Sequence, residues 1–207
     1  GNGSLAILAA MEFPDVTVTA SDLSADALAV ARINVDRHQL ANRVALVQSD
    51  GLAAPELAAR GPFDLILCNP PYVNADSMAS LPAEFRAEPA MALDGNTQGA
   101  RDGMDFIRSL FKTLVPHMTP GAVLVLEIGH ERAYFEAAFP QLEVVWLDTS
   151  AGGDQVRGDA VQLGDQDADA LGAQRHRGRG SRAGRVAGEQ LLDRDAVGEV
   201  GVHRADV

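Results

Sequence analysis

The sequence predicts an α/β fold with a mostly parallel β-sheet and helices on both of its faces. Segments with the pattern of strands alternate along the chain with segments of helical periodicity, an order that favours parallel strands. The run FDLILC at residues 63–68 is apolar enough for a strand covered on both faces. The chain has 207 residues, 46% of them hydrophobic, which suffices for one domain with its own core.

The expected elements follow in chain order. Residues 4–11 have the pattern of a helix, and the β-branched run VTVTA at 16–20 favours a strand. Ser24 is a suitable N-cap, so a helix is expected over residues 24–38. Further strands are expected at 44–47, 63–68, 122–128 and 142–147, and further helices at 104–115 and 131–139.

Composition divides the chain at residue 156. Every Phe, Tyr, Trp and Pro lies in residues 1–156, whereas residues 157–207 contain none of these. A segment without aromatic residues or hydrophobic periodicity buries too little apolar surface to offset the entropy of ordering. We therefore expect a folded domain at 1–156 and a low-complexity tail at 157–207 that is disordered, foreign or read in a shifted frame. Resequencing the locus around Val156 would test the last of these.

The charge and the cysteine content indicate the cellular compartment and the kind of partner to expect. The formal net charge is −12, with 20 acidic against 9 basic residues before residue 157. This favours a basic protein partner over direct nucleic-acid binding. The single cysteine, Cys68, excludes a disulfide framework and suits a reducing cytoplasm. No stretch approaches membrane-spanning length, and no histidines are paired as metal ligands, so neither a membrane nor a metal is expected.

The most informative motif is the tetrapeptide Asn69, Pro70, Pro71 and Tyr72, directly after the expected strand at 63–68. Two prolines end the strand, and the carboxyl ends of parallel strands face the ligand crevice of an open α/β sheet. The Asn69 amide oxygen and the Pro70 carbonyl are two acceptors that suit one planar NH2 group, on which Tyr72 can stack. Holding both hydrogens orients the nitrogen lone pair toward an electrophile, as methyl transfer requires. The alternative is a rigid turn without a ligand.

A second group of residues indicates a nucleotide-like ligand. Gly1 and Gly3 precede the first expected helix, and Asp22 ends the next strand about twenty residues later, the spacing at which an acid reaches a ribose hydroxyl. Asp50 follows the next strand and is placed to approach an adenine edge. The alternatives are plain loop glycines, and Asp22 and Asp50 as caps of the helices that follow them.

Five segments together resemble a known family over residues 1–156. In order, GNGSLAILAA, TASDLSADALAVARINVDRH, QSDGL, FDLILCNPPYV and LPAEFRAEPAMAL resemble the HemK/PrmB family of class I S-adenosylmethionine-dependent protein N(5)-glutamine methyltransferases. The stretch after NPPYV is most similar to the branch that acts on ribosomal protein L-three, with the release-factor branch as a close relative. The resemblance implies a Rossmann-like fold, S-adenosylmethionine as cofactor and a glutamine side-chain amide as substrate.

The resemblance also implies roles for individual residues. Gly1 and Gly3 approach the methionine part of the cofactor, and Asp22 binds its ribose hydroxyls. Asn69 lies between cofactor and substrate and holds the substrate amide, in a slot completed by the two prolines and Tyr72. The family's EP pair, residues 88–89, shapes the substrate side through Glu88 and Pro89; the alternative is that the pair belongs to a surface loop.

The chain departs from the family's pattern in three places. The family has a substrate-recognising helical region and a first central strand before the position of Gly1. The segment at 93–103 is several residues longer than usual, and after Val156 the family continues with an apolar last strand. The sheet is therefore expected to lack its first and last strands, and the chain to be unstable or inactive as it stands.

The expected reaction is a direct displacement in which the glutamine nitrogen attacks the sulfonium methyl and releases S-adenosylhomocysteine, with catalysis mainly by positioning. No general base is identified. Two other classes remain open. An N(6)-adenine nucleic-acid methyltransferase shares the tetrapeptide but requires a basic cleft that residues 1–156 do not supply. The other is an inactive nucleotide-binding fragment.

Overall fold

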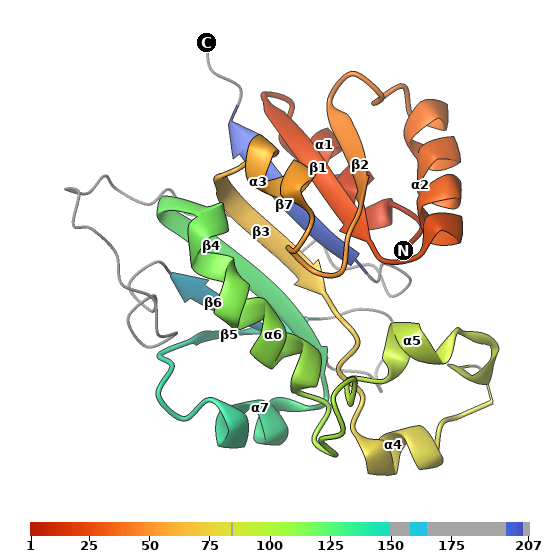
Figure 1. Cartoon of the computed structure of the whole chain (residues 1–207), viewed down its shortest axis with the longest axis vertical. Coiled ribbons are helices and arrows are strands. Elements are labelled where there is room, and N and C mark those ends of the chain that lie inside the picture. The colour runs from red at the N-terminus through yellow and green to blue at the C-terminus, as the bar shows by residue number, and fades with distance from the viewer. Residues whose placement is uncertain (84, 150–157, 165–197, 205–207) are drawn as a thin grey trace.

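The computed structural model describes residues 1–83, 85–149, 158–164 and 198–204, whose strands form one seven-stranded sheet in the order β2-β1-β7-β3-β4-β6-β5 (Figure 1). Two strands, β6 (Gly158–Gly164) and β7 (Gly198–Arg204), run antiparallel to their neighbours. The others share one direction, so the mostly parallel sheet is confirmed: β1 (Val16–Asp22), β2 (Val44–Gln48), β3 (Phe63–Asn69), β4 (Met118–Gly129) and β5 (Val145–Thr149).

Helices cover both faces of this sheet, as the sequence predicts. On one face lie α1 (Ser4–Glu12) and α2 (Ala25–Arg37), and on the other lie α3 (Pro55–Arg60), α6 (Asp105–Leu114) and α7 (Arg132–Ala138). Two short helices, α4 (Ala75–Ala79) and α5 (Ala90–Leu93), lie beyond the carboxyl end of β3 (Figure 1). Two 3-10 turns, Phe85–Ala87 and Val115–His117, complete the described helices. None of these helices is long and apolar enough to cross a bilayer.

The alternation of side chains along β3 and β4 divides the core into two clusters. Leu65 and Leu67 face α1 and α2, whereas Ile66 and Leu124 face α3, α6 and α7. Because both faces are covered, β3 is apolar at almost every position, as its sequence pattern predicts. This alternation fixes which side chains share a face at the carboxyl end of the sheet.

Most predicted elements are confirmed with small shifts at their ends. Ser24 caps α2 by accepting a hydrogen bond from the Ala27 N–H at 3.2 Å. β4 begins at Met118 rather than at residue 122, and β5 begins at Val145 rather than at residue 142. The short helices α3, α4 and α5 were not predicted, because helices of four to six residues are too short to show periodicity.

The structure differs from the expected sheet at two positions. β7 lies between β1 and β3 and pairs with both, and β6 lies between β4 and β5. Strands from the expected tail therefore occupy both places where the sequence predicted a missing strand. The physical reason is that the facing backbone groups of β1 and β3 require hydrogen-bond partners in the middle of a sheet. The other tail residues, 157, 165–197 and 205–207, lie outside the described residues.

Candidate active site

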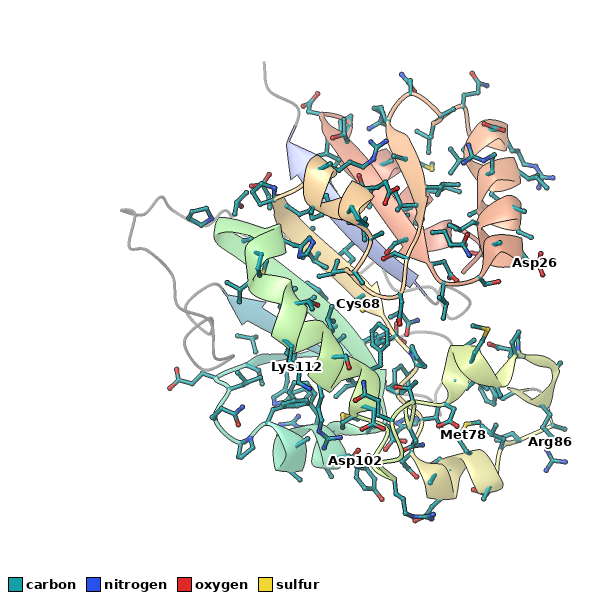
Figure 2. The ribbon with its side chains drawn as sticks, viewed as in Figure 1. Asp26, Cys68, Met78, Arg86, Asp102 and Lys112 are labelled. Atoms are coloured by element: carbon teal, nitrogen blue, oxygen red, sulfur yellow. The ribbon has the colours of Figure 1, made fainter. Side chains whose placement is uncertain are left out.

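The carboxyl ends of β1, β2, β3 and β4 meet at one edge of the sheet, where the chain also begins (Figure 1). The ends of β1 and β2 are tied together by the Ser49 N–H, which donates to the Asp22 carbonyl oxygen at 3.0 Å. In Figure 2, Cys68 marks the last part of β3, and Met78 and Arg86 mark the short elements beyond its end. This edge contains most of the residues that the sequence singled out.

Asp22 and Gly1 are brought together at the end of β1. The Asp22 Oδ2 atom forms an ion pair with the Gly1 amino group, whose pKa burial lowers to about 6. The Asp22 Oδ1 atom accepts a hydrogen bond from the Ser24 N–H at 2.7 Å. Asp22 thus braces the turn before α2, while the cap of that helix is Ser24.

Gly3 adopts a left-handed conformation, with φ of 86°, at the N-cap of α1. A Cβ atom at this position would lie 3.0 Å from the Cβ atom of Ala31 in α2. Two constraints therefore favour glycine here: the positive φ and the close approach of α1 to α2. The close approach brings the turn before α1 against α2 at the same edge as Asp22.

Asp50 is exposed in the turn that follows β2. Its carbonyl oxygen accepts a hydrogen bond from the Ala53 N–H at 3.1 Å, and no side chain caps α3. The alternative role of Asp50 as the cap of that helix is therefore wrong. The buried hydroxyl of Ser49 accepts a hydrogen bond from the Ala54 N–H at 3.0 Å and shapes the turn instead.

Asn69 is the last residue of β3 and is only 5% exposed. Within the described part of the chain its side-chain amide has no hydrogen-bond partner. Pro70 after it is also buried, and Tyr72 is half-buried against the end of β4. A Cβ atom added at Gly129 would lie 2.7 Å from the ring atom Cε2 of Tyr72, so the phenol ring rests directly on the Gly129 backbone.

Three carboxylates surround the Tyr72 phenol. Burial raises the pKa of Tyr72 well above its ordinary value, and the charges of Glu127, Glu131 and Glu88 raise it further. Burial also raises the pKa of Glu127 to about 7. The Glu88 charge therefore acts on the tetrapeptide, whereas Pro89 is exposed at the N-cap of α5.

A buried hydrogen-bond network connects the tetrapeptide to the start of α7. Asn74 is the N-cap of α4, and its Oδ1 atom accepts hydrogen bonds from the N–H groups of Asp76 and Ser77, each at 2.9 Å. Its Nδ2 atom lies 2.8 Å from both carboxylate oxygens of Glu131, the N-cap of α7. Both side chains are buried, so this pair fixes the segment after the tetrapeptide against the end of β4.

The segment at residues 93–103 closes against the same tetrapeptide. The Gly103 N–H donates to the Asn96 Oδ1 atom at 2.8 Å, and the Gly95 N–H donates to the Val73 carbonyl oxygen at 3.2 Å. A side chain at Gly103 would overlap the carbonyl of Tyr72. These residues therefore form a loop whose two ends are hydrogen-bonded to each other and pack on the tetrapeptide.

Sequence reasoning missed three residues at this edge, namely Asn74, Glu127 and Gly129. Glu127 had a visible signal, because it is a charged residue inside the apolar run AVLVLEIG. Asn74 had the signal of an N-cap residue two positions after Tyr72. The position of Gly129 beneath Tyr72 depends on the pairing of β3 with β4, which the sequence does not state.

Comparisons with known proteins show which proteins the chain is similar to. Residues 1–96 match the family described as Methyltransferase small domain. The chain is 50% identical over 156 residues to the ribosomal protein uL3 glutamine methyltransferase of Bordetella pertussis, an alignment that covers 75% of this chain and 50% of that protein. It is 53% identical over 156 residues to the protein of the same name from Burkholderia pseudomallei, an alignment that covers 73% of this chain and 50% of that protein. The chain thus spans about half the length of the curated relatives it matches.

A solved structure supports the fold. The methyltransferase from Pyrococcus furiosus superposes with a TM-score of 0.56 and 19% sequence identity, covering 80% of this chain and 71% of that one. At this identity the likeness concerns the arrangement of strands and helices. The Rossmann-like α/β fold expected from the sequence is thereby confirmed.

Proposed function

We propose that this chain, a relative of the ribosomal protein uL3 glutamine methyltransferases with a class I methyltransferase fold, contributes the site for methylation of a glutamine side-chain amide. The observation that carries the proposal is the Asn69 side chain, which is only 5% exposed and forms no hydrogen bond within the described residues, at the carboxyl end of β3 and next to the braced Tyr72 ring. Such an amide can offer both its oxygen and its NH2 group to a ligand.

The tetrapeptide is suited to hold a planar amide. In our proposal the Asn69 Oδ1 atom and the Pro70 carbonyl oxygen accept the two hydrogens of the glutamine NH2 group, and the Tyr72 ring with Pro71 completes the slot. This arrangement orients the nitrogen and excludes water from it, which lowers the barrier by positioning. The Gly129 backbone behind the ring keeps Tyr72 from receding.

The residues at the ends of β1 and β2 fit S-adenosylmethionine, which supplies an electrophilic methyl group when bound. The Asp22 carboxylate lies at the same edge as Asn69 and is held by the Ser24 N–H, an orientation suited to ribose hydroxyls. Gly3 packs without a side chain against α2, and Gly1 lies in the same turn before α1. Asp50 is exposed after β2, in the place suited to an adenine edge. We propose these four residues as the cofactor side.

The proposed substrate is ribosomal protein uL3, the protein named in the relatives. All proposed site residues lie in residues 1–156, which we propose as the methyltransferase domain. This region carries 20 acidic and 9 basic residues, so it attracts a basic protein and repels a phosphate backbone. Glu88 and Pro89 lie on the side of α5, where we place the substrate segment. Such a reaction belongs in the cytoplasm, where ribosomal proteins are made.

The test offers labelled S-adenosylmethionine to the purified protein with ribosomal protein uL3, a peptide release factor and DNA in one mixture. We expect the label on a glutamine of uL3, identified by peptide mass spectrometry. Label on the release factor would move the protein to the release-factor branch. Label on DNA adenine, or binding of the cofactor without any transfer, would contradict the proposal.

A further inference from the structure

Glu127 is a half-buried carboxylate that the proposed reaction does not yet use. It lies near the end of β4, between residues that are otherwise apolar, and its Oε2 atom is buried without a hydrogen-bond partner in the described part of the chain. A carboxylate in such a place costs free energy, so its presence calls for a specific role.

Strand register places Glu127 beside Asn69. β3 and β4 are parallel, with Leu67 opposite Val125 and Cys68 opposite Leu126. One position further along both strands come Asn69 and Glu127. Paired positions of parallel strands point to the same face, and neighbouring strands lie about 5 Å apart. The two polar side chains are therefore neighbours on the face that α1 covers.

The Tyr72 ring supports the same placement. It rests on Gly129, which lies two positions beyond Glu127 in β4. Among the charges that act on the Tyr72 phenol, that of Glu127 is the largest. Glu127 thus adjoins both side chains of the tetrapeptide to which we assign substrate binding.

The chemistry of the two groups suggests what the carboxylate does. An asparagine amide has an accepting end and a donating end of nearly the same shape, and only its oxygen suits the glutamine hydrogens. An ionised carboxylate accepts hydrogen bonds and donates none, so it can bind only the Asn69 Nδ2 group. A protonated carboxyl can also donate to the Asn69 oxygen and thereby stabilise the reversed amide.

We propose that Glu127 is a positioning residue, which in its ionised form holds the Asn69 amide with the oxygen directed at the substrate. This inference rests on the proposed function for its catalytic consequence. The two groups are not hydrogen-bonded to each other in the structure, and the contact forms when substrate orders the Asn69 amide, since catalytic hydrogen bonds commonly tighten on binding.

The Glu127 carboxyl changes between its protonated and ionised forms near neutral pH. Burial raises its pKa to about 7, so the carboxylate form gains population as the pH rises through that value. The titratable group on which the Glu127 charge acts is Tyr72 after β3, whose phenol also feels the charges of Glu131 and Glu88. On β6 the backbone of Asp159 pairs with Gly129. The Tyr72 phenol stays protonated throughout this range because its pKa is raised.

The first experiment measures kcat for uL3 methylation between pH 5.5 and 9 in the wild-type protein and in E127Q. We expect the wild-type kcat to rise about tenfold through a pKa near 7, as expected when one ionisation controls the active form. In E127Q this step disappears and kcat falls at least tenfold at pH 8, while the KM for S-adenosylmethionine is unchanged. The matched control E143Q replaces an exposed glutamate and keeps the wild-type profile. An unchanged profile in a folded E127Q would overturn the inference.

A second readout does not depend on activity. The side-chain 15N resonance of Asn69, assigned by its loss in N69A, is followed from pH 5.5 to 9 in the presence of free glutamine. A shift with a midpoint near 7 in the wild-type protein and no such shift in E127Q would support the inference. Its absence in the wild-type protein would overturn it. If this shift occurs but no protein is methylated, the proposed function fails while the Glu127 to Asn69 coupling stands.

Discussion

The proposed chemistry depends on the side-chain amide of Asn69. This amide forms no hydrogen bond within the described residues and can therefore bind a ligand. Replacing it by alanine removes one acceptor for the substrate hydrogens. We expect N69A to lower kcat for uL3 by about 100-fold, the typical effect of deleting one preorganised polar contact of a transition state. The affinity for S-adenosylmethionine, measured by calorimetry, should change by less than about threefold, since most cofactor contacts lie elsewhere.

The control for N69A is N42A, which removes an exposed asparagine in the turn before β2. It should leave kcat and the cofactor affinity unchanged. Equal losses of turnover and cofactor affinity in N69A would contradict the role assigned to Asn69, because they would show that the amide serves the cofactor alone.

Gly129 offers a test of the Tyr72 ring position. A methyl group at Gly129 would lie 2.7 Å from the ring, closer than atoms can approach, and the residue has a positive φ of 54°. We expect G129A to displace Tyr72 and reduce kcat by at least tenfold. The comparison variant is G99A, because Gly99 also has a positive φ, 94°, but has open space around it.

Both glycine variants carry the cost of a positive φ, about 1 kcal/mol in the free energy of unfolding. Only G129A adds the collision with the ring, so the difference in kcat between the two isolates that collision. Equal activities in G129A and G99A would mean that the ring position does not matter for turnover.

At the scale of elements, the pair of Asn74 and Glu131 joins the N-cap of α4 to the N-cap of α7. The variant N74D keeps the Oδ1 acceptor for the cap but places a second carboxylate 2.8 Å from Glu131. We expect a loss of about 1 to 3 kcal/mol in the free energy of unfolding at pH 7, measured with urea. The control N42D changes the net charge by the same amount and should leave the free energy of unfolding nearly unchanged.

The pH dependence of N74D has a definite sign. Two adjacent carboxylates raise the pKa of the pair in the folded state, so the folded form binds more protons than the unfolded chain. The destabilisation is therefore full at neutral pH and shrinks as the pH falls through the raised pKa. A deficit that stays constant between pH 7 and pH 4.5 would show that repulsion is not its cause.

The sequence predicts the elements that have a period or an uninterrupted apolar run, such as β3 and α2, because those patterns are local. It also places Asp22 and Asn69 at strand ends, and parallel strands bring such ends to one edge. The sequence could not predict that Asn69 lies near Glu127 or that Tyr72 lies near Gly129. Both depend on the register between two strands that are distant in the chain. β6 and β7 were missed because their segments lack the aromatic content typical of strands.

At the scale of the whole molecule, β7 joins the two halves of the sheet by pairing with both β1 and β3. A proline within β7 removes an N–H from this ladder and clashes with a central strand. We expect V200P to lower the free energy of unfolding by at least about 3 kcal/mol, or to abolish a cooperative urea transition followed by circular dichroism. The control V200A keeps the N–H at the same position of the ladder and should retain a cooperative transition with a much smaller loss of stability. Similar stability of both variants would show that the central strand does not hold the sheet together.

The position of β7 also determines when this protein can fold during its synthesis. The ribosome delivers β1 and β3 long before residues 198–204, and until then their facing edges have no partner from this sheet. Pairings between such distant segments form slowly, and exposed strand edges invite aggregation and chaperone binding. Nascent chains arrested before residue 198 should therefore remain protease-sensitive, and resistance should appear only once residues 198–204 have left the ribosome.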